Sequence, residues 1–364
     1  MKQEYAISHW PDSKEILENL RVLANELPVY QINRSKMNEY LEKYESKFAK
    51  SKQMVALAKQ RIPGGVQHNL AFNYPFPLAI AKADGAYLYD VSGNRFIDFL
   101  QAGGPTVLGS NYKPVRDKVL ELINECGPVT GLFHEYEYKL ADLIYSHVPS
   151  AEMFRSLASG TEGCMAAIRA ARCFTDKKFV IKVGGGYHGW SDQFVFAMRI
   201  PGLGTLDSHG IPEGCFQYMQ EFYPNDTAAL EKLLKDNESK GGTAAVIVEP
   251  LGPESGTRPV HRDFNEKVKA LCDSYGTLLI FDEVVTGFRV GLGGAQGYFG
   301  IKPDLTVFGK CVAGGYPAAG GVGGRKEIML TFAAGIQGLK KRAMVGGTLS
   351  ANPLSCSAGY FAIK

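Results

Sequence analysis

The chain has 364 residues, of which 45% are hydrophobic, and its 40 basic and 37 acidic side chains are mixed along its length. This length and hydrophobicity favour a two-domain subunit with a large core. A net charge of only +3 offers no basic surface for nucleic acid. The N-terminus is too polar for a signal peptide, and no apolar run reaches the roughly 20 residues of a membrane helix. We therefore expect a cytoplasmic globular protein without membrane or nucleic-acid partners.

The cysteines are scattered, and no two of them form a CxxC pair. An odd number at such spacing predicts reduced, mostly buried thiols of an intracellular protein. They are Cys126, Cys164, Cys173, Cys215, Cys272, Cys311 and Cys356.

Residues 1–60 are charged and helix-prone, and we expect them to form a helical N-terminal arm. Residues 86–98 alternate apolar and polar side chains around Ser92-Gly93-Asn94, which predicts a β-hairpin. We place this hairpin in the N-terminal part of a small domain, residues 61–105. A helix should follow, because Val115, Val119, Leu122, Ile123 and Cys126 recur at helical spacing.

Further along, short apolar strands alternate with helices. A helix after residue 262 should begin at Asp263, with Glu266 completing a capping box. The alternation predicts an α/β fold whose mostly parallel sheet is covered by helices, with ligands beyond the carboxyl ends of the strands. The expected strands are Phe179–Val183, Ala244–Val248, Thr277–Phe281 and Leu305–Phe308.

We expect residues 106–340 to form the large, ligand-binding domain. Residues 341–364 should form an interdomain turn and the start of a C-terminal helix. Because no helix stop signal follows Ala358, we expect the sequence to be a fragment that lacks most of a smaller α+β C-terminal domain.

Lys310 follows an apolar strand and precedes a glycine-rich stretch, and no carboxylate lies near it in the sequence. A buried ammonium is costly, so a lysine in this setting tends to be neutral or covalently bound. The glycines allow another molecule to approach the backbone closely. Together these features suggest a Schiff-base lysine with pyridoxal phosphate (PLP) as the aldehyde. The alternative is a strand-end lysine that extends into solvent.

Asp282 ends an apolar strand at the edge where ligands bind. A carboxylate that faces a pyridine nitrogen keeps that nitrogen protonated, so that the ring accepts electrons from a substrate carbanion. Asp282 and Lys310 are placed for opposite ends of one such ring. An aspartate that only caps a strand or turn is the other interpretation.

Ser159-Gly160-Thr161-Glu162 precedes a small-residue helix. Backbone amides, a hydroxyl and the positive helix end would make this segment a natural phosphate-binding site. The same four residues also suit a helix N-cap without any ligand.

Gly184-Gly185-Gly186-Tyr187-His188-Gly189 matches GxGxxG formally, but no long helix follows, so we reject a dinucleotide site. We expect instead a loop on which Tyr187 stacks on a pyridine ring with His188 beside it. His188 as a hydrogen-bonded structural histidine is the alternative. Glu249, at the end of another strand, adds a carboxylate near the same site. The histidines show no metal-ligand spacing, so we expect no metal.

These segments together resemble the class III aminotransferases, a family of fold-type I PLP enzymes, and most of all the branch that contains glutamate-1-semialdehyde aminomutase. The resemblance extends from about residue 55 to the end of the chain. Its motifs are Pro63-Gly64-Gly65-Val66, the hairpin to Asp98, Ser159–Glu162, Tyr187-His188-Gly189, Glu249-Pro250, Asp282–Arg289, Lys310 with its glycines, and Gly347–Pro353.

The resemblance implies a role for each of these residues. Lys310 would carry the cofactor and shuttle a proton, and Asp282 would pair with the pyridine nitrogen. Tyr187 and Val284 would cover the two ring faces, and Gly160 and Thr161 would bind the phosphate. His188 and Glu249 would complete the cofactor site. Thr348 would reach the phosphate of the neighbouring subunit, which implies a homodimer.

One departure concerns the substrate. The aminomutase carries a serine and an arginine for the substrate carboxylate after Gly64-Gly65-Val66, whereas this chain has Gln67–Ala71. Three functions therefore stay open. The first is an aminotransferase that uses a small amino donor and a carbonyl acceptor. The second is an intramolecular aminomutase or a racemase, and the third is an incomplete or non-catalytic module of a larger protein.

Overall fold

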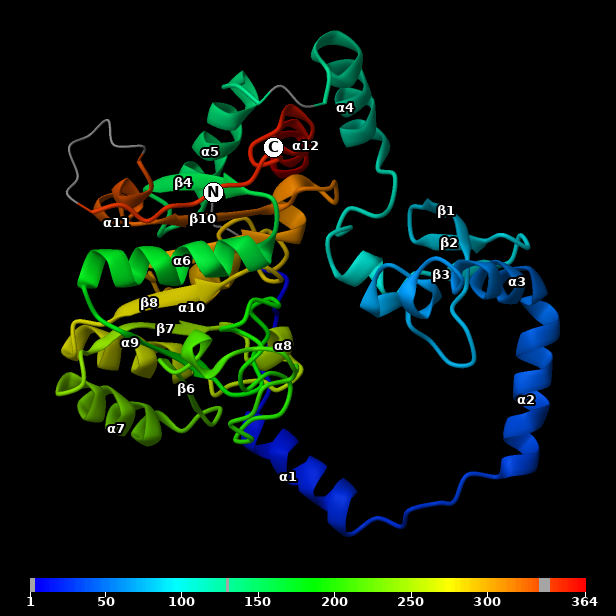
Figure 1. Ribbon diagram of the computed structural model, residues 1–364, viewed down its shortest axis with the longest axis horizontal. Helices are drawn as coiled ribbons and strands as arrows, with labels where there is room; N and C mark the ends of the chain where they lie inside the picture. Colours follow the sequence, from blue (N-terminus) through cyan, green and yellow to red (C-terminus); the bar gives the residue numbers. More distant parts are fainter. Residues whose placement is uncertain (1–3, 129–130, 334–340) are drawn as a thin grey trace. The chain divides into compact units, whose positions relative to one another are not determined.

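The computed structural model describes residues 4–128, 131–333 and 341–364. The chain forms two compact units. Unit 1 consists of Met1–Ile16 and Pro114–Lys364, and unit 2 consists of Leu17–Lys113. Helix α1 (Ser13–Asn25) crosses the boundary between them. Figure 1 shows the helices and strands of both units.

Unit 2 contains the larger part of α1, the complete helices α2 and α3 and a three-stranded antiparallel sheet. The predicted hairpin is confirmed, since Tyr87 pairs with Ile97. Its turn is held by the Asp90 carboxylate, which accepts hydrogen bonds from the backbone N–H groups of Ser92 and Asn94. The elements are α2 (Arg34–Lys47), α3 (Ala49–Ala58), β1 (Ile80–Asp84), β2 (Tyr87–Asp90) and β3 (Arg95–Ile97).

In the described part of unit 1, seven strands form one sheet in the order β4-β10-β9-β8-β7-β5-β6. Strand β10 is antiparallel to β4 and β9, and every other pair is parallel. This confirms the predicted mostly parallel sheet, and each predicted strand agrees with the structure within one residue at either end. The strands are β4 (Met153–Leu157), β5 (Phe179–Val183), β6 (Met219–Phe222), β7 (Thr243–Val248), β8 (Leu278–Asp282), β9 (Leu305–Gly309) and β10 (Gly320–Gly324).

Helices cover both faces of this sheet (Figure 1). Helix α6 (Gly160–Thr175) packs on one face, while α7 (Thr227–Glu238) and α9 (Phe264–Ser274) pack on the other. Strand β8 contributes Leu278 and Ile280 to the α6 side and Leu279 and Phe281 to the α9 side. A strand that is buried on both faces is apolar at successive positions, which explains its uninterrupted hydrophobic run.

The capping box predicted for α9 is wrong in its side chains, although the helix begins where expected. Asp263 is the N-cap residue, but its carboxylate caps no backbone N–H group. It pairs instead with the Lys267 ammonium at 2.7 Å, one helical turn further on. An exposed lysine at i+4 competes for the carboxylate, and the bridge-region backbone of Asp263 (φ −93°, ψ 1°) does not match the extended conformation of a side-chain cap.

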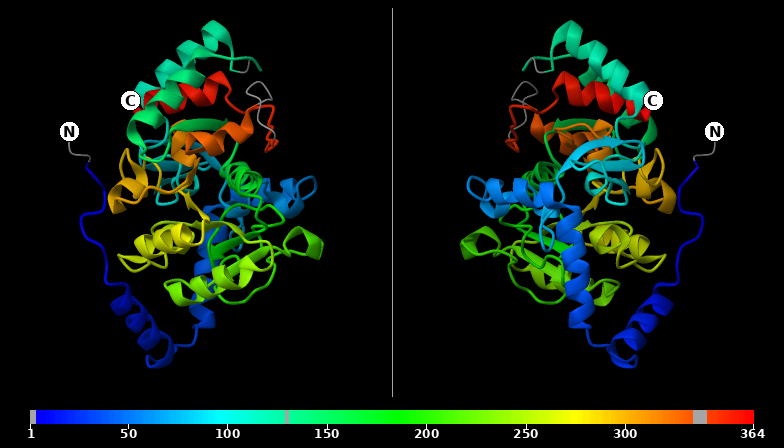
Figure 2. Two further views of the ribbon diagram at one scale, coloured as in Figure 1. Left: turned by 90° about the vertical axis from the view of Figure 1, so that its left-hand side faces the viewer. Right: turned by 90° about the vertical axis from the view of Figure 1, so that its right-hand side faces the viewer.

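A second group of helices packs at the β4 end of the sheet. Figure 2 shows α12 (red) beside α4 (teal), and Val115 and Val119 of α4 pack against Ala358 of α12. The predicted helix at residues 115–126 is thus confirmed. The helices of this group are α4 (Lys113–Cys126), α5 (Glu135–His147) and α12 (Pro353–Ile363). Unit 1 also contains the short helices α8 (Pro253–Gly256), α10 (Gly294–Phe299) and α11 (Lys326–Met329).

The first described residues of the chain lie along unit 1. The Trp10 indole donates a hydrogen bond to the Val260 carbonyl at 3.1 Å and packs edge-on against Phe299. Four cysteines are buried, whereas Cys126 is exposed. Across the described ranges, no helix is both long and apolar enough to span a membrane.

Candidate active site

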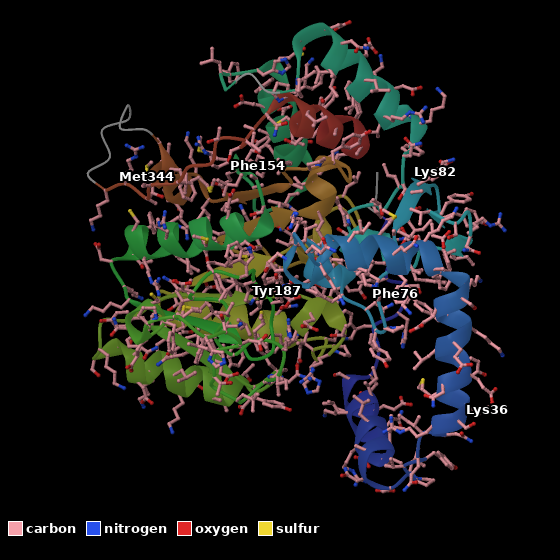
Figure 3. All side chains as sticks on the ribbon, turned by 45° about the vertical axis from the view of Figure 1, so that its right-hand side comes forward. Lys36, Phe76, Lys82, Phe154, Tyr187 and Met344 are labelled. Carbon is pink, nitrogen blue, oxygen red and sulfur yellow. The ribbon has the colours of Figure 1, made fainter. Side chains whose placement is uncertain are left out.

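Apart from Thr348, the predicted site residues of unit 1 come from the carboxyl ends of its parallel strands, from the loops after them and from the start of α6. The loop after β5 carries Tyr187, which is labelled in Figure 3, and His188. Glu249 directly follows β7, Asp282 is the last residue of β8, and Lys310 follows β9. Strands β7, β8 and β9 are neighbours in the sheet, so these carboxyl ends lie side by side.

Asp282 is buried and its carboxylate accepts hydrogen bonds from three protein groups. Oδ1 accepts the backbone N–H of Val284 at 3.0 Å. Oδ2 lies 2.7 Å from Nδ1 of His188 and 3.4 Å from the Cys164 sulfur. Because a carboxylate has about four acceptor positions, one position on Oδ1 is left over.

His188 is buried beside Asp282. Burial lowers the pKa of His188, which favours a neutral ring with its proton on Nδ1, facing the carboxylate. Its other nitrogen, Nε2, is buried without a hydrogen-bond partner among the described residues. The structure therefore confirms the hydrogen-bonded histidine that the sequence left as one interpretation, and it places this histidine on the predicted site carboxylate.

The Lys310 amine is half-buried and has no hydrogen-bond or ion-pair partner among the residues that the structure describes. Burial lowers its pKa, so a larger fraction of the amine is neutral than in a solvated lysine. The backbone of Lys310 is also unusual, because its φ of 47° lies in the left-handed region. Such a conformation costs of the order of 1 kcal/mol for a residue with a Cβ and is typical of functional sites.

Val284 lies between the start of α6 and the end of β9. A Cβ added to Gly160 would lie 2.7 Å from Val284 Cγ2, and one added to Gly309 would lie 2.8 Å from Val284 Cγ1. Both positions therefore require glycine for packing rather than for backbone conformation. This contact brings the predicted phosphate-binding residue Gly160 to the residue that precedes Lys310.

The N-terminus of α6 is capped on one side and open on the other. The Ser159 hydroxyl accepts the backbone N–H of Glu162 at 3.2 Å. The backbone N–H groups of Gly160 and Thr161 have no acceptor within the described chain. Thr161 directly contacts Gly189 of the β5 loop. Free amides at the positive end of a helix bind anions, so this end of α6 suits a phosphate.

Glu249 holds the loop that carries Tyr187. Its Oε1 accepts the backbone N–H groups of Tyr187 at 2.8 Å and of Glu254 at 2.9 Å, and Oε2 accepts the Ser255 hydroxyl at 2.9 Å. Burial raises the pKa of Glu249 to about 7, although these donors oppose the shift. The Tyr187 ring above it is 46% exposed and is free to contact a ligand.

Thr348 lies on an exposed turn that is closed by a 3.0 Å hydrogen bond from the Ser350 N–H to the Gly347 carbonyl. A Cβ on Gly347 would lie 3.7 Å from the Glu162 carboxylate, which places this turn near the start of α6. The Thr348 side chain is not among the groups that surround Asp282 and Lys310.

Sequence reasoning missed Cys164 and Ser255. Cys164 was treated only as a buried thiol, yet its sulfur lies within 4.8 Å of ligand atoms of both His188 and Asp282. Its position one turn after Gly160 on α6 was a usable signal, because residues i and i+4 share a helix face. The 2.7 Å contact between His188 and Asp282 fits a hydrogen bond, and we interpret the three side chains as a hydrogen-bonded group.

Comparison with known proteins decides the family. The family model described as "Aminotransferase class-III" matches residues 70–364. The chain belongs to the class III aminotransferases. This confirms the resemblance on which the expected cofactor and fold depended, and members of this family are enzymes that use PLP.

Individual relatives agree with this family. The chain is 41% identical over 316 residues to "Glutamate-1-semialdehyde 2,1-aminomutase 1" of Lachnoclostridium phytofermentans, which covers 85% of this chain and 72% of that protein. The fold of this chain is similar to that of an omega-transaminase from Sphaerobacter thermophilus, with a TM-score of 0.80 and 31% sequence identity. The match covers 86% of this chain and 72% of the transaminase. The fold is also similar to a structure described as "Transaminase with PLP bound" (TM-score 0.79, 30% identity, 87% and 73%).

The residues of this class III aminotransferase fit PLP chemically. A buried carboxylate with one open acceptor position suits a protonated pyridine nitrogen, and unpaired amides at a helix N-terminus suit a phosphate. The half-buried Lys310 amine, which has no partner among the described residues, suits an aldehyde. The exposed aromatic ring of Tyr187 on the β5 loop suits stacking on a face of the PLP ring.

Proposed function

We propose that this chain is an aminotransferase in which Lys310 binds PLP and moves a proton on the substrate, with Asp282 at the opposite end of the cofactor ring. The single observation that carries this proposal is the pair itself. Asp282, buried and hydrogen-bonded, ends β8, and Lys310, half-buried and without a partner among the described residues, directly follows the neighbouring parallel strand β9. When bound, PLP supplies the carbonyl carbon that takes up an amino group and the ring that accepts the electrons left by proton removal.

The remaining residues bind and orient. We assign the phosphate to the amides of Gly160 and Thr161, and we assign the ring faces to Tyr187 and Val284. Asp282 keeps the ring nitrogen protonated, and His188 holds the carboxylate in its orientation. Glu249 donates no proton in this account, because its oxygens are used by the Tyr187 loop and by Ser255. Its role is to hold Tyr187 in place.

Lys310 acts as the proton carrier. Burial lowers the pKa of Lys310, so a larger fraction of its amine is neutral than in a solvated lysine, and the neutral amine can accept the proton from the substrate carbon and later return it. The negative charges of Asp282 and Glu249 favour the positive charge that Lys310 acquires. The amino donor and carbonyl acceptor are small molecules in this proposal.

A second function, an intramolecular aminomutase, is favoured by relatives that carry that name at 41% and 42% identity. The segment Gln67–Ala71, which lacks an arginine for a substrate carboxylate, weighs against it. One experiment separates the two. The PLP-loaded protein is mixed with an amino donor without any acceptor, and separately with glutamate-1-semialdehyde alone.

An aminotransferase converts about one donor per site and then stops until a keto acid is added. An aminomutase turns over repeatedly on glutamate-1-semialdehyde without an acceptor. If the loaded protein shows neither reaction with a broad panel of donors, the proposed function is wrong and a non-catalytic module becomes the better explanation.

We also propose that the enzyme acts as a cytosolic homodimer, in which Thr348 completes the phosphate site of the neighbouring subunit. The exposed turn at Gly347–Ser350 supports the shared phosphate site, and the buried thiols Cys164, Cys272 and Cys356 support a reducing compartment. A mixture of Lys310→Ala and Thr348→Ala subunits tests the dimer. Each mixed dimer then contains one site with both Lys310 and Thr348 intact, so activity at low PLP should exceed that of either parent. If the mixture is no more active than the Lys310→Ala and Thr348→Ala parents, the proposed shared site is wrong.

A further inference from the structure

Cys164 has a specific place in the described site. It is fully buried on the sheet-facing side of α6, and its sulfur is 3.4 Å from Oδ2 of Asp282, within the distance of a hydrogen bond to sulfur. No other role in the site is assigned to it. A buried thiol is usually a small apolar side chain, so its contact with a buried carboxylate calls for an explanation.

The direction of this hydrogen bond follows from the charges. A carboxylate only accepts hydrogen bonds, so the Cys164 S–H donates to Oδ2. Burial, followed by the negative charge of Asp282, raises the pKa of the Cys164 thiol well above its usual value. The thiol therefore keeps its proton, and a thiolate beside the carboxylate does not form.

We propose that Cys164 is a positioning residue that, together with His188, occupies Oδ2 of Asp282 and so leaves Oδ1 for the nitrogen of the cofactor ring. This inference rests on the proposed function, because it presumes a ring nitrogen at Asp282. The Val284 N–H occupies one acceptor position of Oδ1, while His188 and Cys164 occupy both positions of Oδ2. Of about four acceptor positions on the carboxylate, only the second one on Oδ1 remains, and we assign it to the ring nitrogen.

Helix α6 links the Cys164–Asp282 contact to the proposed phosphate site. Gly160 and Cys164 are one turn apart and therefore share a face of the helix. The amide end of that face is the proposed phosphate site, and the next turn holds the carboxylate. A single rigid element thus sets the distance between the groups that bind the phosphate and the ring nitrogen.

The experiment compares Cys164→Ala and Cys164→Ser with the wild type. Alanine removes the donor, whereas serine keeps a donor of smaller size. Cys272→Ala, which removes a thiol buried on α9 at the other face of the sheet, is the matched control. The readouts are the pH titration of the visible absorption band of the PLP-loaded protein, the PLP dissociation constant and the thermal unfolding transition.

Loss of the donor leaves more negative charge on Asp282, which favours the protonated form of the bound chromophore. We expect the titration midpoint of Cys164→Ala to rise by more than about 0.3 pH unit, as for a weak hydrogen bond to a charged group. The midpoint of Cys164→Ser should equal or fall below that of the wild type, and Cys272→Ala should titrate as the wild type. The neighbouring charged groups Lys182, Glu249 and Lys310 are the same in all variants.

The outcomes separate the two proposals. A wild-type chain that develops no visible band with PLP overturns the proposed function and this inference with it. A normal wild-type band with an unshifted Cys164→Ala titration overturns the inference alone. Equal shifts in the alanine and serine variants also overturn it, because they indicate a packing effect. If alanine prevents folding, the serine variant decides, since a raised midpoint there contradicts donation to Asp282.

Discussion

Nδ1 of His188 lies 2.7 Å from Oδ2 of Asp282, and both side chains are buried. This contact joins the loop after β5 to the end of β8, two strands that are separated by β7 in the sheet. It fixes the carboxylate from one side while leaving an acceptor position free. The proposed reaction depends on that carboxylate remaining an anion beside a ring nitrogen.

Replacing Asp282 by asparagine tests this dependence. The amide still accepts a hydrogen bond from His188 but carries no charge, so the ring nitrogen loses the anion that keeps it protonated. We expect kcat to fall by about a hundredfold or more, equivalent to about 3 kcal/mol in the barrier. PLP should remain bound at Lys310. Asp263→Asn, at the exposed start of α9, is the control and should keep wild-type kcat. Equal losses in both variants would contradict the assignment.

The contact between Gly160 and Val284 allows a double-mutant test. Gly160→Ala places a Cβ 2.7 Å from a Val284 methyl group, which should reduce PLP affinity and destabilise the protein by about 1–3 kcal/mol. Val284→Ala removes both Val284 methyl groups that this Cβ would meet. The double variant should therefore lose less than the sum of the two single losses. Gly214→Ala, whose Cβ would meet its nearest atom only at 3.9 Å, should be neutral. Strict additivity would show that the two residues do not touch in solution.

Glu249 predicts a pH dependence of stability. Its pKa is about 7 in the folded protein against an ordinary 4.5, so between these values the folded state holds a proton that the unfolded state has released. The free energy of unfolding therefore falls as the pH rises from 4.5 to 7, by about 3 kcal/mol from this group, and becomes flat above.

Glu249→Gln carries no titrating proton and should flatten this fall, as measured by denaturant unfolding across the same pH range. The slope is the informative quantity, because the amide also changes the hydrogen bonds to Ser255 and so the absolute stability. Glu231→Gln on the exposed side of α7 should keep the wild-type slope. An unchanged slope in Glu249→Gln would mean that this carboxylate is ionised throughout.

The sequence predicted the parts of the fold that short-range patterns determine. β8 is apolar at successive positions because it is covered on both faces, so its run of Leu278–Phe281 marked a buried strand. Asp282 and Lys310 were found for the same reason, since a polar residue at the end of such a run is conspicuous. The capping box at Asp263 failed because two nearby partners, a backbone amide and Lys267, compete for one carboxylate, and sequence spacing does not decide between them.

The site contacts that the sequence did not predict join residues far apart in the chain. Cys164 and Asp282 are separated by 118 positions, and Glu249 meets the Tyr187 amide across 62. Neither residue type signals its partner, since a thiol on an apolar helix face is ordinary and a strand-end glutamate has many uses. Only the packing of α6 and of the β5 loop on the sheet brings these groups together.

The most direct test of the account is chemical trapping of the lysine. The protein is saturated with PLP, reduced with borohydride and digested, and the peptide that carries the pyridoxyl group is identified by mass spectrometry. We predict one modified residue, Lys310, and no adduct or yellow colour at the site in Lys310→Ala. An adduct on another lysine, or a Lys310→Ala variant that turns over at the wild-type rate, would contradict the account.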